Sequence, residues 1–296
     1  MNAVSYGVME THLRRLRGDG RKLLVPYITG GMIEHWVECI QTVADAAADA
    51  IEVGIPFSDP MIDGPVIQEA SVRALDRGTT PVGVIDAVAV ADIGVPVVAM
   101  TYYNVVFRMG HRRMARSLRA AGITGALVPD LPLEELDPWA AEAGHAGVAT
   151  VLLVAPSTPE ERVARICARS HGFVYAVARM GVTGERETLG TEATTVVRRI
   201  RATTDTPVCV GIGVSTPAQA RAVCKVADGV VVGSALVRRL LEGGGPDAAG
   251  EFVSSLRAAL DDPDPDDPDP DDPAPEDPAN PAGHAGPGDG EALAGS

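Results

Sequence analysis

Short runs of apolar, often β-branched residues alternate along the chain with longer amphipathic segments. Runs such as Thr150–Val154 are almost continuously apolar, which is typical of parallel strands buried on both faces. The longer segments between them have the apolar spacing of surface helices. The predicted strands are Leu23–Ile28, Ala50–Gly54, Val95–Thr101, Gly125–Val128, Thr150–Val154, Phe173–Val177, Pro207–Val210 and Gly229–Val232.

A predicted helix follows each of these strands, so the strands should be parallel and joined by crossover helices. Eight such units in about 250 residues favour a closed (β/α)8 barrel, the TIM-barrel architecture, over a doubly wound open sheet. In this fold the active site lies at the C-terminal ends of the strands. The predicted helices are Ile33–Ala48, Val66–Arg77, Pro81–Asp92, Arg112–Ala121, Leu133–His145, Pro159–His171, Glu192–Thr203, Pro217–Val226, Ser234–Leu241 and Asp247–Leu260.

The segment from Asp261 to Ser296 differs in composition from the rest of the chain. It holds 12 of the 40 acidic residues, 9 of the 23 prolines and no lysine or arginine. Because it has almost no large apolar side chain to bury, we predict that it is disordered and extended. The chain thus divides into a barrel domain, residues 1–260, and an acidic Pro/Asp-rich tail, residues 261–296, which either aids solubility or contacts a basic partner.

Without this tail the chain is nearly neutral, with 28 acidic residues against 25 basic ones. That balance argues against a broad nucleic-acid-binding surface, which requires concentrated positive charge. No apolar run approaches the length of a membrane span, and the N-terminal segment lacks an apolar signal core. The four cysteines show no CxxC pattern and the six histidines form no HxxxH pair. We expect a cytoplasmic protein with reduced cysteines, no metal site and no membrane or nucleic-acid partner.

Two acidic residues belong to the second strand and the loop after it. Glu52 lies between two apolar residues of the strand, so alternation directs its side chain away from them and into the barrel mouth. Asp63 follows in a loop that Gly64 and Pro65 constrain. Two carboxyl groups in different environments can hold different pKa values, so that one donates a proton while the other is ionised. The structural alternative is a Glu52 paired with arginine and an Asp63 that caps the next helix.

Glycine-containing turns follow the seventh and eighth strands. The first contains Gly211 and Gly213, and the second contains Gly233 and Ser234 at the start of a short helix. Backbone N–H groups near glycine and the dipole of a helix N-terminus both favour an anion. A phosphate site after these two strands is a recurrent feature of such barrels. Alternatively, the glycines only permit tight turns.

The segment EVGIPFSDPMIDGPVIQ, residues 52–68, strongly resembles the signature of the tryptophan synthase alpha chain family. VPYITGG, MTYYN, VPDLP, FVYAVARMGVTGE, GIGVS and VVGSA resemble further family segments in the same order. The resemblance implies a lyase that cleaves indole-3-glycerol phosphate to indole and glyceraldehyde 3-phosphate, as the alpha subunit of tryptophan synthase in L-tryptophan biosynthesis. It implies no cofactor in this chain and a pyridoxal-phosphate-dependent beta subunit as partner in an alpha2beta2-type assembly.

The same resemblance implies roles for individual residues. Glu52 would protonate carbon C3 of the indole and handle the proton of the glycerol hydroxyl group. Asp63 would accept a hydrogen bond from the indole N–H, and Thr183 would meet Asp63 when the loop Arg179–Gly190 closes. Tyr27, Met100, Tyr102 and Leu127 would line an indole slot, Tyr175 would lie beside Glu52, and Gly184, Gly213, Gly233 and Ser234 would bind the phosphate.

Three departures from the family pattern raise other hypotheses. Gly30-Gly31-Met32 replaces the usual glycine, acidic or aromatic residue and proline, the segment Gly78–Val95 is short, and Ile62 replaces a small residue. The first and third changes lie on loops that face the beta subunit in the family. The alternatives are a standalone lyase that supplies free indole, or a weakly active barrel that activates a beta-like partner. Another phosphosugar barrel enzyme, such as an isomerase of histidine or tryptophan synthesis, is disfavoured by the two acids.

Overall fold

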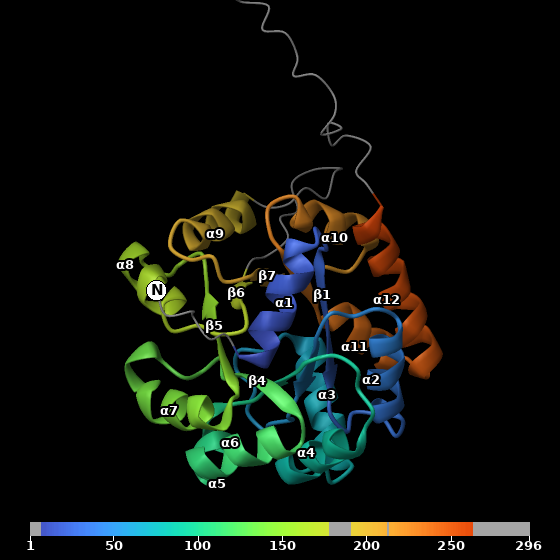
Figure 1. Ribbon diagram of the computed structural model, residues 1–296. Coiled ribbons are helices and arrows are strands. Elements are labelled where there is room, and N and C mark those ends of the chain that lie inside the picture. Colours follow the sequence, from blue (N-terminus) through green and yellow to red (C-terminus); the bar gives the residue numbers. More distant parts are fainter. Residues whose placement is uncertain (1–6, 178–190, 212, 263–296) are drawn as a thin grey trace, which may run out of the picture. The chain divides into compact units, whose positions relative to one another are not determined.

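A computed structural model describes residues 7–177, 191–211 and 213–262 of the chain. Eight strands, each parallel to its neighbours, close into a barrel in chain order (Figure 1). The predicted (β/α)8 barrel is confirmed, and the doubly wound sheet is excluded. The strands are β1 (Leu23–Thr29), β2 (Ile51–Gly54), β3 (Val97–Met100), β4 (Ile123–Leu127), β5 (Ala149–Val154), β6 (Val174–Val177), β7 (Val208–Gly211) and β8 (Gly229–Val232).

Helices surround this barrel, and the last of them packs against the helix that follows β1 and against the one that follows β7. They are α1 (Val8–Gly18), α2 (Trp36–Asp45), α3 (Pro65–Asp76), α4 (Pro81–Val90), α5 (Tyr103–Met109), α6 (His111–Ala120), the 3-10 helix η1 (Leu133–Glu135), α7 (Asp137–Ala146), α8 (Glu160–Cys167), α9 (Thr191–Arg201), α10 (Pro217–Cys224), α11 (Ser234–Leu241) and α12 (Gly245–Asp261).

The structure differs from the predicted elements in identifiable places. Helices α1 and α5 were not predicted. Helix α1 precedes the first strand, and α5 lies between β3 and α6, from which one glycine, Gly110 (φ +86°), separates it. The helix predicted over Leu133–His145 is divided into η1 and α7. The second part begins at Asp137 because Pro138, which has no N–H to donate, is favoured in the first turn of a helix.

The interior of the barrel is lined by side chains that the strand register brings together. Tyr27 pairs with Glu52, and Gly54, two residues farther along β2, pairs with Met100, which pairs with Leu127. Residues two apart on a strand and partners on neighbouring strands project from the same face of a sheet. A Cβ built on Gly54 would lie 2.0 Å from the Tyr27 hydroxyl oxygen. The tyrosine therefore crosses this face, which is the inner face of the barrel.

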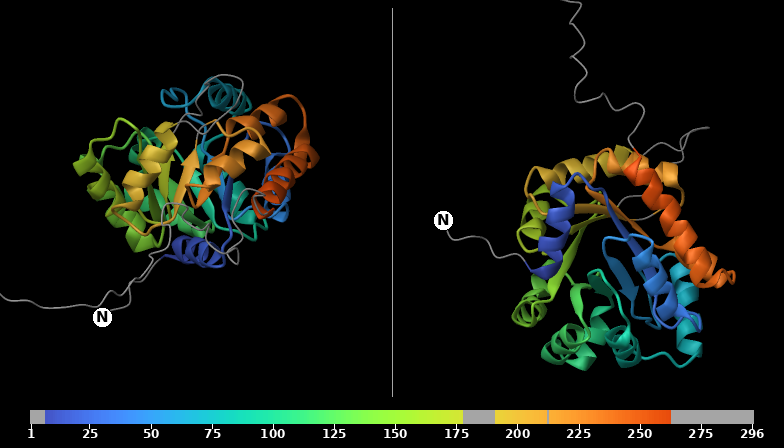
Figure 2. Two further views of the ribbon diagram at one scale, coloured as in Figure 1. Left: turned by 90° about the horizontal axis from the view of Figure 1, so that it is seen from above. Right: turned by 45° about the vertical axis from the view of Figure 1, so that its right-hand side comes forward.

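Helix α1 closes the N-terminal end of the barrel, which we call the floor (Figure 2). Met9 of this helix is fully buried. A Cβ built on Gly125 would lie 2.6 Å from the Met9 Cε, and one built on Gly172 would lie 2.9 Å from its Sδ. The next residue, Glu10, is also buried, and its carboxylate accepts a hydrogen bond from the Gly172 N–H at 3.0 Å. Met9 thus fills space that two glycines leave open.

Two aspartates at the floor fasten neighbouring strands to each other. Asp49, just before β2, accepts a hydrogen bond from the Leu24 N–H at 2.8 Å. Asp228, just before β8, accepts one from the Val208 N–H, also at 2.8 Å. Asp49 is also paired with Arg21 at 2.6 Å and with the buried Arg257 of α12 at 3.0 Å. These carboxylates therefore have both amide and guanidinium partners.

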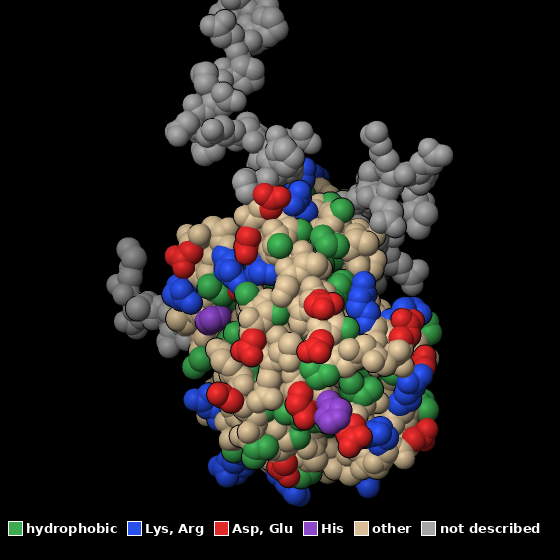
Figure 3. Space-filling view, turned by 90° about the vertical axis from the view of Figure 1, so that its right-hand side faces the viewer, with side chains coloured by type: hydrophobic (Ala, Val, Ile, Leu, Met, Phe, Trp, Pro, Cys, Tyr) green, Lys and Arg blue, Asp and Glu red, His purple; other side chains and the backbone are tan. Residues whose placement is uncertain are grey.

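The outer face over α12 and α2 intermingles acidic, basic and apolar side chains (Figure 3). This matches the near-neutral charge of the chain before its acidic tail. Within the described ranges, no helix is both long enough and apolar enough to span a membrane. The domain boundary at residue 260 and the disorder of the tail stay predictions, because residues 263–296 lie outside the described ranges. Helix α12 itself ends at Asp261.

Candidate active site

Glu52 of β2 lies at the mouth of the barrel, and only 3% of its surface is exposed. Burial raises the pKa of its carboxyl group to about 8, and the negative charge of Asp63 contributes to the same shift. Across the described residues no arginine or lysine forms an ion pair with Glu52. The alternative of a Glu52 held by arginine therefore has no support in this part of the chain, and a pKa of about 8 leaves the Glu52 carboxyl group mainly protonated at neutral pH.

Asp63 lies in the loop Ile55–Gly64 and is half-buried. Burial raises the pKa of its carboxyl group to about 6, although a hydrogen bond from the Tyr102 hydroxyl opposes the shift. The predicted alternative, a cap for the next helix, is wrong. Gly64 is the N-cap residue of α3, and no side chain caps this end. At pH 7 the geometry thus holds an ionised Asp63 near a protonated Glu52.

Two tyrosines occupy the inner wall beside these acids. The Tyr27 hydroxyl hydrogen-bonds the Thr29 Oγ1 at 3.1 Å, and a Cβ built on Gly211 would lie 1.9 Å from the Tyr175 hydroxyl oxygen. Burial raises the pKa of both tyrosines, and the charge of Glu52 raises both further. Both hydroxyl groups are therefore neutral at any working pH. Each can donate a hydrogen bond within the mouth.

Apolar side chains complete the inner wall. Met100 of β3 and Leu127 of β4 are register partners, and 8% and 3% of their surfaces are exposed. Tyr102, two residues beyond the end of β3, is also buried, and its ring stacks on that of Phe57 with 5.0 Å between centroids. The structure thus places Tyr27, Met100 and Leu127 on β1, β3 and β4, and Tyr102 just beyond β3. Their assignment to an indole slot stays a prediction.

The predicted phosphate residues lie where β7 and β8 end. Gly211 pairs with Val231, so the turns that contain Gly213 and Gly233 leave neighbouring strands at the same end of the barrel. Gly233 is the N-cap residue of α11 and offers no side-chain cap, and Ser234 is exposed. The first N–H groups of a helix lack intrahelical partners and favour an anion. Thr183 and Gly184 lie outside the described residues.

The departures from the family pattern contact one another. Gly31 has a φ of +79°, and a Cβ built on it would lie 2.1 Å from the Thr79 Oγ1. A Cβ built on Gly30 would lie 2.8 Å from a methyl carbon of Val84. Both Thr79 and Val84 belong to the segment Gly78–Val95, which is the second departure. The two glycines therefore leave room for side chains of this segment.

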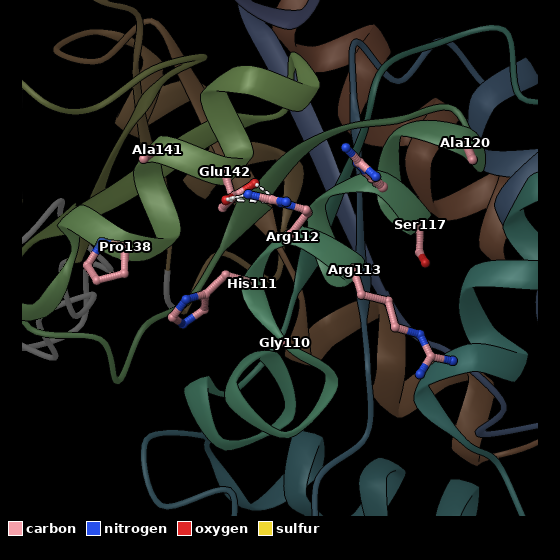
Figure 4. Close-up of a pocket in the computed structure, with 10 residues that line it drawn as sticks. Gly110, His111, Arg112, Arg113, Ser117, Ala120, Pro138, Ala141 and Glu142 are labelled. Atoms are coloured by element: carbon pink, nitrogen blue, oxygen red, sulfur yellow. Dashed lines mark hydrogen bonds and ion pairs between the residues drawn. The ribbon is translucent and has the colours of Figure 1, made fainter.

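A surface groove lies away from these residues, between α6 and α7 on the helical layer (Figure 4). Its walls include Arg112, Arg113 and Arg116 of α6, and the Arg112 guanidinium pairs with Glu142 of α7 at 3.2 Å. None of the predicted site residues lines this groove. Within the described part of the chain, no cluster of histidine, cysteine, aspartate and glutamate could hold a metal ion.

The sequence analysis missed two residues that contact predicted site residues, Thr29 and Phe57, and one that follows a barrel strand, Asp130. Thr29 and Phe57 contact Tyr27 and Tyr102, but nothing in their spacing marked them. Asp130 follows β4 and accepts a hydrogen bond from the Tyr103 N–H at 2.8 Å. A position after a barrel strand was the signal that could have identified Asp130.

Comparison with known proteins gives a consistent result. The family model described as tryptophan synthase alpha chain matches residues 13–256. The tryptophan synthase alpha chain of Streptomyces coelicolor is 46% identical over 253 residues, which cover 84% of this chain and 93% of the relative. That of Halorhodospira halophila is 46% identical over 258 residues, covering 84% and 94%.

Solved structures agree with these relatives. A structure of Mycobacterium tuberculosis tryptophan synthase matches with a TM-score of 0.80 at 37% identity, and the match covers 86% of this chain and 99% of that chain. The tryptophan synthase alpha subunit of Legionella pneumophila matches with a TM-score of 0.78 at 32% identity, covering 87% and 99%. The fold, the order of the motifs and these relatives agree, and the chain belongs to the tryptophan synthase alpha chain family.

Proposed function

We propose that this chain performs the lyase reaction of its family in L-tryptophan biosynthesis, the cleavage of indole-3-glycerol phosphate to indole and glyceraldehyde 3-phosphate. The observation that supports this most directly is the pair of acids at the barrel mouth. The pKa of Glu52 is about 8 and that of Asp63 is about 6. Between these pH values Glu52 is mainly protonated and Asp63 mainly ionised, and a retro-aldol cleavage needs this division of roles.

The proposed reaction uses Glu52 twice. The protonated carboxyl group first donates its proton to carbon C3 of the indole. The resulting carboxylate then removes the proton from the hydroxyl group on the side-chain carbon bonded to C3. The bond between C3 and that carbon breaks, its electron pair returns to the ring, and the carbon becomes the aldehyde carbonyl. Positioned proton transfer of this kind typically accelerates a reaction by roughly 10²–10⁴-fold.

Asp63 has a different role in this proposal. Its carboxylate accepts a hydrogen bond from the indole N–H and stabilises the positive charge that develops there when C3 is protonated. Because the indole ring itself accepts the electrons, we propose that the reaction needs no metal ion or organic cofactor in this chain. Thr183 would meet Asp63 from the loop Arg179–Gly190, an assignment that rests on the family alone.

The substrate would lie with its ring in the apolar slot and its phosphate at the glycine turns. Tyr27, Met100, Tyr102 and Leu127 would enclose the ring, and their burial supports exclusion of water from the acids. Tyr175 would lie beside Glu52 as a neutral hydrogen-bond donor. The phosphate would be bound by backbone N–H groups and the hydroxyl at Gly184, Gly213, Gly233 and Ser234.

A beta subunit is the partner that we propose, and the exposed apolar side chains at the mouth support it. Met61, Ile62 and Phe107 are 90%, 56% and 64% exposed. Met61 and Ile62 belong to the loop Ile55–Gly64, and Phe107 belongs to α5. A hydrogen bond from the Ile62 N–H to the Tyr102 hydroxyl joins this loop to the start of α5. Large exposed apolar side chains on linked segments are a feature of protein-binding faces. Pyridoxal phosphate would belong to that partner, in an alpha2beta2-type assembly in the cytoplasm.

The test is the release of indole from indole-3-glycerol phosphate by the purified chain, alone and with a beta subunit from the same source. Slow release that rises sharply with the beta subunit would support the alpha-subunit role. Fast release by the chain alone would indicate a standalone lyase. Activation of the beta subunit without any release would leave a barrel that serves only as an activator, and no effect in either assay would contradict the proposed activity.

A further inference from the structure

The loop Ile55–Gly64, which contains Asp63, contacts the side chain of Tyr102. The Ile62 N–H donates a hydrogen bond to the Tyr102 hydroxyl at 3.3 Å. The same hydroxyl lies near the carboxyl group of the next residue, Asp63, and lowers its pKa against the effect of burial. The ring of Phe57 stacks on the Tyr102 ring with an interplanar angle of 22°. Three residues of one loop therefore depend on where Tyr102 lies.

The position of Tyr102 depends in turn on the start of α5. Tyr102 is the N-cap residue of this helix, with an extended backbone (φ −87°, ψ 149°), and its own side chain makes no cap hydrogen bond. The first helical N–H, that of Tyr103, donates instead to the Oδ1 of Asp130 at 2.8 Å. Asp130 lies in the loop after β4, so a different strand supplies the cap that the helix lacks.

Helix α5 has only seven residues. Helices this short have little stability of their own, because nucleation is unfavourable and few hydrogen bonds follow it. A carboxylate at the N-terminus supplies both a hydrogen-bond acceptor and a favourable charge for the helix dipole. Removing Asp130 would therefore loosen the first turn of α5, and with it the backbone that holds Tyr102.

We infer that Asp130 is a positioning residue for Asp63, which it fixes through the start of α5 and the Tyr102 hydroxyl. Asp130 does not touch the substrate in this scheme and acts only through Tyr102. The importance of this arrangement for turnover rests on the proposed function, but the arrangement itself does not. Its effect on the ionisation of Asp63 can be measured without substrate.

Several titratable groups face Asp63. The charge of Asp63 acts on Glu52 of β2, Tyr27 of β1, Tyr175 of β6 and Tyr102. Of these, Tyr102 donates a hydrogen bond that lowers the pKa of Asp63 against the effect of burial. Loss of this hydrogen bond should therefore raise the pKa of Asp63, and the acid limb of the pH profile of kcat/KM should move to higher pH.

Three variants and a matched control separate positioning from general loosening. Asp130→Ala removes the acceptor, whereas Asp130→Asn keeps an oxygen that can accept from the Tyr103 N–H. Tyr102→Phe keeps the ring and removes only the hydroxyl. Tyr103→Phe is the control, because it removes a hydrogen bond of the same helix, that of the Tyr103 hydroxyl with the His111 Nε2 at 3.1 Å. His111 lies on the wall of the groove between α6 and α7 (Figure 4).

The first readout is the carboxyl ¹³C NMR titration of Asp63 in the full, substrate-free chain, with the signal assigned from Asp63→Asn. Asp130→Ala and Tyr102→Phe should raise its pKa by roughly 0.5–1 units, the size that one lost hydrogen bond produces. Asp130→Asn and Tyr103→Phe should leave it unchanged. In the lyase assay, Asp130→Ala should lower kcat about tenfold with little change in KM.

An unchanged Asp63 titration in Asp130→Ala would overturn the inference, whatever its activity. If this variant does not fold, an unchanged titration in Tyr102→Phe would overturn it equally. If the titrations shift as expected while the unaltered chain releases no indole with or without a beta subunit, the positioning role stands and the proposed function fails.

Discussion

Both ends of the barrel bury carboxyl groups, but they give them different partners. At the floor, Asp49 accepts hydrogen bonds from a backbone N–H and is paired with Arg21 and Arg257. At the mouth, Glu52 and Asp63 have no basic partner among the residues that the structure describes, and burial raises the pKa of both. A carboxylate with arginine partners stabilises the fold, whereas one without them can exchange a proton near neutral pH.

This contrast suggests a rule for variants. Changes at the mouth should affect turnover more than stability, and changes at the floor should do the reverse. The pair Glu52 and Glu10 allows a direct comparison, because both are buried glutamates, 3% exposed each, at opposite ends of one barrel.

The largest expected effect is that of Glu52→Gln. The amide cannot donate and recover a proton, so kcat for indole release should fall by roughly 10²–10⁴-fold. The circular dichroism spectrum should stay that of the unaltered chain. Glu10→Gln, the matched control, weakens the contacts with the Gly172 N–H and Arg14. It should keep kcat within twofold and lower the melting temperature. If Glu52→Gln kept its turnover, Glu52 would not be the acid and base of the reaction.

Asp49→Ala should have the largest effect on stability. It leaves the buried Arg257 without one carboxylate partner and the Leu24 N–H without its acceptor. Removing one partner of a buried ion pair typically costs about 3–5 kcal/mol of the free energy of unfolding. Urea denaturation measures this loss, while kcat of the folded protein stays the same. Asp19→Ala is the control, because Asp19 pairs with Arg15 on the exposed surface and should change stability by less than about 1 kcal/mol.

A pH-dependent effect on stability follows from the raised pKa of Glu52. Between its ordinary value of 4.5 and about 8, the unfolded chain has lost this proton while the folded chain retains it. The unfolded state therefore binds fewer protons, and the Glu52 contribution lowers stability as pH rises through this window. Glu52→Gln removes that contribution. At pH 8 the variant should gain stability over the unaltered chain, by roughly 4 kcal/mol relative to the difference between them at pH 4. A stability difference that is the same at both pH values would show that Glu52 ionises normally.

The smallest effect is expected at the end of the chain. Removal of residues 263–296 should leave kcat and the melting temperature within experimental error, since we predict no packing for this acidic segment. Removal from Asp261 onward is the sharper comparison. Asp261 pairs with Arg257 at 2.8 Å and Asp262 pairs with Arg221 at 3.1 Å. The longer deletion should therefore lower the melting temperature slightly, and a large loss in the shorter deletion would contradict the tail prediction.

The two ends also differ in how far the sequence could predict them. The strands and Glu52 were predictable because continuous apolar runs and strand alternation are local signals. The floor was not, because its partners lie far apart: Asp49 meets Arg257 across 208 positions of sequence. Helix α1 was missed for the same reason, because Met9 packs against Gly125 and Gly172, which lie far from it in the sequence. At the mouth, the link from Asp130 to Tyr102 depends on backbone geometry that no residue pattern reveals.

The burial of Met9 against Gly125 and Gly172 also affects how this protein folds during its synthesis on the ribosome. Synthesis delivers α1 first, yet the glycines that receive Met9 leave the exit tunnel only after five strands have emerged. At translation rates of about 5–20 residues per second, roughly 8–30 seconds pass between the synthesis of Met9 and that of Gly172. During that interval Met9 and Leu13, both fully buried in the finished barrel, lack the contacts that bury them there.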